Sequence, residues 1–161
     1  MPSTRLRPAA SPTVRYGLAI VTLLLALPAA GAAQTSALAF VPGATPPISV
    51  IDVATRMLET IIPIGFEAQS ATASPDGRWI YVPDGIGRAI TVIDVASRLV
   101  VASIPVPAMP FAVVFSPDGA VAYVSCDASA QIAVIDLKEK KVSALIDVGK
   151  TADGMAWAPA K

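Results

Sequence analysis

The stretch ITVIDVASR, residues 90–98, decides the fold because the chain contains it in three versions. It reads ISVIDVATR at 48–56 and IAVIDLKEK at 132–140, so successive copies start 42 residues apart. Each copy joins a short β-branched apolar run to a polar turn, which is typical of a strand entering a hairpin and not of a helix. A repeat of this period indicates an array of similar structural units.

One unit divides into four short strands, which we name A to D. The second complete copy predicts them at 110–116, 120–125, 131–136 and 141–148. Four antiparallel strands in about 40 residues are typical of a β-propeller blade. The C strand, ITVIDV in the first complete copy, is apolar on both faces, as sheets stacked face to face require, whereas a two-layer sandwich leaves one face polar. The sequence therefore predicts an all-β chain of propeller blades.

The A and B strands are joined by SPDG at 74–77 and again at 116–119. Proline presets φ for the first central position of a type I turn, aspartate suits the second, and glycine supplies the left-handed position that closes the hairpin. Asp76 and Asp118 are also conceivable ligands, but their role in the turn already explains them.

Each C strand ends in an aspartate that is followed four positions later by a basic residue. A carboxylate at this position can accept hydrogen bonds from backbone N–H groups of the next turn, with the basic residue nearby across the hairpin. One carboxylate per unit lacks the six to eight oxygens, roughly, that calcium takes, which favours the structural interpretation. The pairs are Asp52 and Arg56, Asp94 and Arg98, and Asp136 and Lys140.

These motifs together carry a family resemblance. SPDG, then an aromatic residue with valine (Tyr81-Val82 and Tyr123-Val124), then IxVID and a hydrophobic last strand, resemble the YVTN-type β-propeller repeat family. The name motif itself differs, since the chain has YVPD and YVSC at these places. The resemblance covers essentially the whole chain after its N-terminal segment, and it implies a secreted or surface-associated scaffold that serves several unrelated functions.

The N-terminal segment has the order of a secretory signal peptide. Three arginines precede the apolar run GLAIVTLLLAL at 17–27, and the small-residue stretch PAAGAAQ follows. We expect cleavage after Ala33 or one residue earlier, which makes 1–33 the signal and 34–161 the mature chain. A retained membrane anchor is the weaker alternative because the apolar run is well short of about 20 residues. No adjacent arginine pair is present, so general secretion to the periplasm or the exterior is expected, with no membrane attachment after cleavage.

Composition excludes several classes of function. The mature part carries 9 basic against 12 acidic residues, with no basic stripe for nucleic acid. The chain has no histidine, the commonest metal ligand and general base. Cys126 is the single cysteine, so no internal disulfide forms; we expect a small buried residue, with a reactive or intermolecular thiol as the alternative. No cofactor is predicted.

The strands add up to about three blades. The sequence predicts strands B, C and D at 37–65, complete units at 66–107 and 108–149, and a lone A strand at 150–161. Propellers usually hold four to eight blades, roughly, so exposed sheet faces and edges would invite association. Three alternatives are open: a shortened relative or fragment of a longer propeller, an open arc docked on a partner, or a head-to-tail homodimer that closes a six-bladed ring.

Ligands of propellers usually meet the end formed by the D–A and B–C loops. The polar residues that the sequence places there show no acid–base or nucleophile pair, and ordinary solvated loop residues are the simpler interpretation. The lone GIG at 85–87 precedes no helix and is not a phosphate cradle, and Trp79 and Trp157 are expected in the core. The candidate ligand-binding residues are Glu67, Gln69, Asp84, Arg88, Asp127 and Asp153.

Two classes of function fit these features. The first is a non-catalytic secreted propeller that binds a protein or carbohydrate partner, or that scaffolds an assembly. The second is a fragment or subunit of a periplasmic propeller enzyme, because the resemblance extends to lactonases and to redox proteins with quinone or metal cofactors. The absence of histidine and of a visible catalytic group favours the first class.

Overall fold

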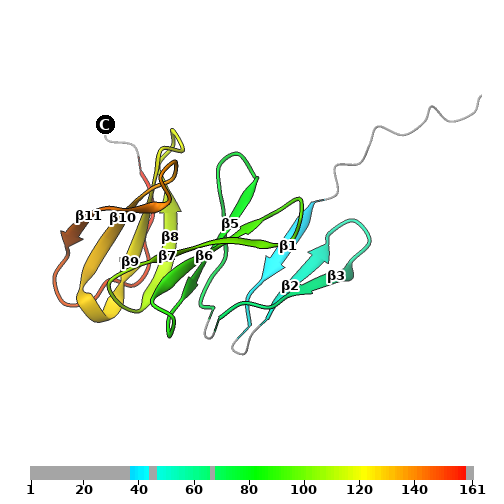
Figure 1. Cartoon of the computed structure of the whole chain (residues 1–161), viewed down its shortest axis with the longest axis horizontal. Helices are drawn as coiled ribbons and strands as arrows, with labels where there is room; N and C mark the ends of the chain where they lie inside the picture. Colours follow the sequence, from blue (N-terminus) through cyan, green and yellow to red (C-terminus); the bar gives the residue numbers. More distant parts are fainter. Residues whose placement is uncertain (1–36, 44–46, 66–67, 159–161) are drawn as a thin grey trace, which may run out of the picture. The chain divides into compact units, whose positions relative to one another are not determined.

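The computed structural model describes residues 37–43, 47–65 and 68–158, and within them the chain is almost entirely β-structure (Figure 1). The predicted signal peptide lies outside the described residues. No helix in the described part of the chain is long and apolar enough to cross a membrane.

The described strands form three antiparallel sheets, each a meander of consecutive strands. Sheet 1 contains three strands, and sheets 2 and 3 contain four each. This confirms the all-β fold of the sequence analysis as a partial β-propeller. The strands of sheet 1 are β1 (Leu38–Val41), β2 (Ile48–Asp52) and β3 (Met57–Ile62). Those of sheet 2 are β4 (Thr72–Ala73), β5 (Trp79–Asp84), β6 (Ala89–Asp94) and β7 (Val100–Pro105). Those of sheet 3 are β8 (Pro110–Phe115), β9 (Val121–Cys126), β10 (Gln131–Asp136) and β11 (Lys141–Asp147).

The SPDG turns form as predicted. Gly77 and Gly119 have φ of 69° and 68°, the left-handed conformation that glycine adopts without strain. In the first turn the Ser74 hydroxyl donates to Asp76 Oδ1 at 2.6 Å and accepts the Trp79 N–H at 3.0 Å. Ser116 makes the same contacts to Asp118 and to the Val121 N–H. The serine thus ties both sides of each hairpin together.

The aspartate that ends each C strand accepts a backbone N–H from the following turn, as predicted. The donors are Thr55, Ser97 and Glu139, at 2.8, 2.6 and 2.8 Å from the carboxylates of Asp52, Asp94 and Asp136. The basic residue that follows does not pair with this aspartate. It stands at a left-handed backbone position, with φ of 59°, 62° and 52° for Arg56, Arg98 and Lys140.

From that position, the basic side chains of sheets 2 and 3 each reach the preceding sheet. Arg98 of sheet 2 forms an ion pair of 2.8 Å with Glu59 of sheet 1. Lys140 of sheet 3 places its Nζ 4.6 Å from the ring centroid of Trp79 in sheet 2. The expected place beside its own hairpin is confirmed for Arg98, whose Nη1 also donates to the carbonyls of Val95 and Ala96 in that turn. The contacts of Arg98 and Lys140 with the preceding sheet were not predicted.

The core consists of two apolar clusters, each between consecutive sheets. Ile48, Val50 and Ile62 of sheet 1 pack on one face of sheet 2. Tyr81, Ile90, Val92 and Ile104, on the other face of sheet 2, pack on sheet 3. Sheet 2 is therefore buried on both faces, which explains why its C strand shows no polar alternation. The sheet 2 residues that pack against sheet 1 are Ile80, Val82 and Ile93. The sheet 3 residues that pack against sheet 2 are Val113, Ala122, Val124, Cys126, Ala133 and Ile135.

Cys126 belongs to the second cluster. It is fully buried, and burial raises the pKa of its thiol. This confirms the interpretation of Cys126 as a small buried core residue.

Candidate functional site

The structure gives the predicted loop residues different surroundings and does not gather them into one described site. Glu67 lies outside the described residues, and Gln69, Arg88 and Asp153 are exposed. Asp127 is half-buried at the start of a 3-10 turn (Asp127–Ser129), and Asp84 is buried. A ligand-binding role for these residues stays a prediction.

Asp84 has a close fit with two glycines. Its Oδ1 accepts the Gly87 N–H at 2.7 Å, which fastens the B–C loop. A Cβ added at Gly65 would lie 1.8 Å from Asp84 Oδ2, and one added at Gly87 would lie 2.4 Å from it. Both glycines are therefore required for the carboxylate to occupy this place, since no real Cβ approaches so closely. The contacts make Asp84 a positioning residue for the loops around it.

Arg88 has a backbone role that the sequence did not reveal. Its φ is 51°, and its carbonyl accepts the Val106 N–H at 2.9 Å. Ala130 occupies the matching position in sheet 3, with φ of 51°, and accepts the Val148 N–H at 3.0 Å. The conformation at this position therefore closes the hairpin whichever side chain stands there. Within the described residues, no group of three or more metal-ligating side chains is found.

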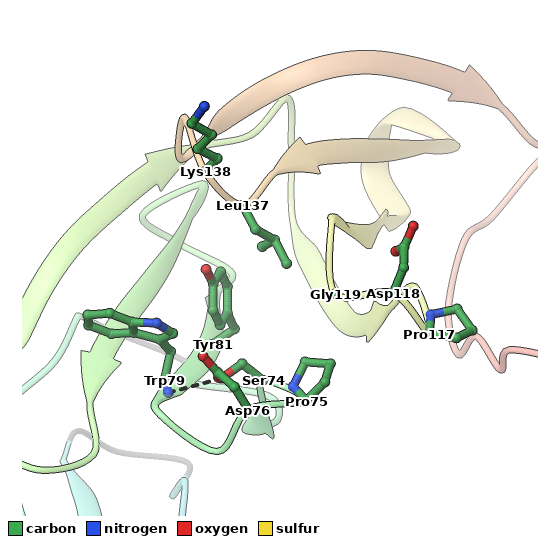
Figure 2. A pocket seen from close by; sticks show the side chains of 10 residues that line it. All are labelled: Ser74, Pro75, Asp76, Trp79, Tyr81, Pro117, Asp118, Gly119, Leu137 and Lys138. Atoms are coloured by element: carbon green, nitrogen blue, oxygen red, sulfur yellow. Dashed lines mark hydrogen bonds between the residues drawn. The ribbon is translucent and has the colours of Figure 1, made fainter.

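A cavity of about 460 Å³ is lined by both SPDG turns (Figure 2). In an antiparallel meander these A–B turns stand at the opposite end of the strands from the B–C loops. The two turns come close together, since a Cβ added at Gly119 would lie 3.9 Å from Pro75. Leu137, from the turn after β10, extends into the space beside Tyr81 (Figure 2). The lining residues are Ser74, Pro75, Asp76, Trp79, Tyr81, Pro117, Asp118, Gly119, Leu137 and Lys138.

The cavity contains two carboxylates in matching environments. The serine hydroxyl of each turn, followed by a backbone N–H, holds the pKa of Asp76 and of Asp118 below the usual value. Both side chains are therefore ionised at neutral pH. In each carboxylate the hydrogen bonds within the described residues go to Oδ1, which leaves Oδ2 without one. Both residues are exposed, one on each turn, and each carboxylate can meet a positively charged group.

The aromatic side chains of the cavity are already engaged by neighbours. Tyr81 is buried, packs edge-on against Phe115 with ring centroids 5.1 Å apart, and has a raised pKa because of its burial. Trp79 is approached by Lys140 and by Arg78, whose Cζ lies 5.5 Å from the ring centroid. These cation–π contacts occupy the Trp79 ring. The cavity therefore offers apolar walls and two carboxylates, its tryptophan ring already has two cationic neighbours, and Lys138 also lines it.

Sequence reasoning assigned Asp76 and Asp118 to their turns and did not combine them into a site. The available signal was the 42-residue spacing of the two SPDG motifs, because consecutive blades place equivalent turns side by side. The usual position of propeller ligands directed the prediction to the opposite end of the sheets.

A family comparison matches residues 47–159 with the YNCE-like beta-propeller. The chain belongs to the YNCE-like beta-propeller family. Among curated proteins, no sequence matches the chain at a significant level.

Two solved structures share the fold. Hydrazine synthase from Kuenenia stuttgartiensis aligns with a TM-score of 0.62 and 23% identity, over 65% of this chain and 30% of that one. Apo AztD from Citrobacter koseri aligns with a TM-score of 0.57 and 18% identity, over 66% of this chain and 30% of that one. At such identities the likeness concerns the fold alone, and this member of the YNCE-like family spans less than a third of either neighbour.

Proposed function

We propose that the chain is a non-catalytic, exported propeller module that binds a partner protein. The observation that carries the proposal is the cavity between the SPDG turns, with the ionised carboxylates of Asp76 and Asp118 beside the apolar Tyr81 and Leu137. A lysine or arginine side chain fits this combination, since its methylene groups can contact the walls while its charged end meets the carboxylates. The YVTN-type character of the repeats is part of the same proposal.

A carbohydrate partner is less well supported by this cavity. Sugar rings are commonly bound by stacking on an open aromatic face, whereas Trp79 is occupied by Lys140 and Arg78, and Tyr81 is buried. A protein partner with an exposed basic side chain therefore fits better. The fragment-of-an-enzyme alternative predicts a stoichiometric metal or a chromophore in the purified protein, and metal analysis with an absorbance spectrum tests it.

The proposal is tested with a library of short peptides that contain lysine or arginine and with the double variant Asp76→Asn/Asp118→Asn. Asparagine keeps the Oδ1 that accepts the turn hydrogen bonds but removes the charge, so the hairpins should persist. Fluorescence anisotropy should show selected basic peptides binding the native chain about tenfold or more tightly than the variant.

The matched control is Asp127→Asn/Asp153→Asn, which removes the same number of charges at two of the predicted loop residues. It should bind the peptides like the native chain. Binding lost in the control and kept in the cavity variant would move the site to the loop end. If the chain binds glycans but none of the peptides, the proposal of a protein partner is contradicted.

Export is proposed from the order of the first 33 residues and is tested separately. When the full chain is expressed in a bacterial host, mass spectrometry of the periplasmic fraction should find a chain that begins at Gln34 or Ala33. Full-length protein in the membrane fraction would contradict cleavage and favour the retained anchor.

A further inference from the structure

Sheets 1 and 3 each have one apolar face that no other sheet covers within the described residues. On sheet 2, Tyr81, Ile90 and Ile104 face sheet 3 and are 2%, 0% and 1% exposed. Their equivalents 42 residues later on sheet 3 are Tyr123, Ile132 and Ile146. Tyr123 and Ile132 are only partly buried, and Ile146 is 46% exposed. Sheet 3 thus exposes the face that is equivalent to the one through which sheet 2 packs on sheet 3.

Sheet 1 presents the complementary face. Phe40 lies opposite Val50 in the β1–β2 ladder, and Tyr81 lies opposite Val92, the equivalent of Val50, in sheet 2. Phe40 is therefore the equivalent of Tyr81, and the next residue, Val41, is the equivalent of Val82. Val82 is fully buried against the preceding sheet, whereas Val41 is 44% exposed. Ile51, on the same face, is only partly buried, whereas its equivalent Ile93 is fully buried. Sheet 1 thus exposes the face that is equivalent to the one through which sheet 2 packs on sheet 1.

Segment 155–157 packs against part of the open face of sheet 3. Trp157 lies against Tyr123 with ring centroids 5.8 Å apart, which repeats the pair of Phe115 and Tyr81 exactly one repeat earlier in sequence. Met155, Ala156 and Trp157 border an apolar cavity of about 300 Å³ with Tyr123, Ile132 and Ile146. The segment therefore holds the place on sheet 3 that β8 holds on sheet 2.

Within the described residues, segment 155–157 and β1 each have no strand on the side where the other could pair. In sheets 2 and 3, β5 and β9 pair with β4 and β8, whereas β1, their equivalent, is an edge strand of sheet 1. Residues 155–157 form no β-ladder within the described part of the chain. Val114 pairs with Tyr123 in sheet 3, so the same register places Ala156 opposite Phe40 of another chain.

We propose that a second copy of this chain covers both open faces, head to tail, and closes the propeller. The sheet 1 face of each copy packs on the sheet 3 face of the other, and each segment 155–157 pairs antiparallel with the other copy's β1. Two copies of three sheets make six, within the range of about four to eight blades, whereas three copies would make nine. Two equivalent interfaces give a closed two-fold assembly.

The position of Arg56 agrees with this arrangement. Arg98 and Lys140 each reach the preceding sheet, and Arg56 stands at the same backbone position of sheet 1. Its guanidinium makes no hydrogen bond or ion pair within the described residues. In the closed assembly the preceding sheet is sheet 3 of the other copy, which Arg56 can reach.

Light scattering coupled to size-exclusion chromatography tests the proposal on the expressed and exported chain. The expected mass is twice that of one chain. Ile146→Glu and Val41→Glu alter opposite faces at side chains exposed in the single chain, so each variant should stay folded by circular dichroism and become a monomer. Each should weaken dimerisation by at least about tenfold. Ile86→Glu, which changes an exposed side chain in the loop between β5 and β6, is the control and should remain a dimer.

Mixing the two monomeric variants identifies the head-to-tail arrangement. A heterodimer of Ile146→Glu with Val41→Glu retains one unaltered interface, so the mixture should recover part of the dimer mass. A monomeric native chain, open polymers, or a dimer that both variants leave intact would overturn the proposal. The proposal does not depend on the cavity between the SPDG turns, so peptide binding and dimerisation can fail independently.

Discussion

At the scale of single residues, aspartate has several structural roles in this chain. Asp52, Asp94 and Asp136 fasten C–D turns, Asp76 and Asp118 fasten A–B turns, and Asp84 fastens a B–C loop. Each carboxylate accepts a hydrogen bond from a backbone N–H. Such bonds give the backbone an alternative to the hydrogen bonds of a helix or sheet, which is why aspartate is favourable in turns. Asp76 and Asp118 also line one cavity.

Gly65 should not tolerate a side chain. Its added Cβ would overlap Asp84, so Gly65→Ala should destabilise the fold by about 1–3 kcal/mol, the usual cost of overpacking. Urea denaturation measures the effect. Gly154→Ala, where an added Cβ meets nothing within 4 Å, is the matched control and should change stability by less than about 0.5 kcal/mol.

A double-mutant cycle identifies the cause. If Gly65→Ala acts through the carboxylate, it should cost much less in an Asp84→Ala background. An equal cost in both backgrounds would show that Gly65 is constrained by something other than Asp84.

The SPDG carboxylates should make stability depend on acid. The pKa of Asp76 and Asp118 is lowered in the folded state, so their contribution is present above the unfolded pKa of about 3.9 and is lost as pH falls through the folded pKa. Thermal unfolding between about pH 7 and about pH 3 should show a steeper loss of Tm in the native chain than in Asp76→Asn/Asp118→Asn. Identical slopes would mean that these carboxylates do not stabilise the turns.

At the scale of elements, each sheet is specified by short-range turns and is stabilised by its neighbours. The strand boundaries and turn types of 110–148 follow from the sequence, because proline, glycine and aspartate determine local backbone geometry. The reach of Arg98 to Glu59 and of Lys140 to Trp79 does not follow, since these contacts depend on how two sheets pack. Phe40 departs by one residue from the 42-residue spacing, so only the strand register identifies it as the equivalent of Tyr81.

The interface between sheets 2 and 3 should carry much of the stability. Ile104 is fully buried there, so Ile104→Ala should cost about 2–5 kcal/mol. Leu99→Ala, at a 63% exposed site of the same sheet, should change stability by less than about 0.5 kcal/mol in the same denaturation assay. Similar losses for the two variants would contradict the assignment of the core to the contacts between sheets.

At the scale of the whole molecule, the 42-residue repeat predicts the fold, and the described residues form three sheets whose outer faces are open. The candidate cavity was not predicted, because it arises from two turns 42 residues apart that only the packing of sheets 2 and 3 brings together. The open faces of sheets 1 and 3 could be expected from the strand count. The place of Trp157 on Tyr123 required the structure, since a lone aromatic residue near a terminus has many possible neighbours.

Amide hydrogen exchange of residues 155–158 and 38–41 tests the central claim most directly. If the two segments form a ladder between copies, those of their amides that point toward the other copy should exchange slowly in concentrated protein and rapidly on dilution below the dimer dissociation constant. The amides of β6, buried inside one chain, should stay protected under both conditions and serve as the internal control. Rapid exchange of residues 155–158 at every concentration would contradict the pairing and, with it, the closed assembly of two chains.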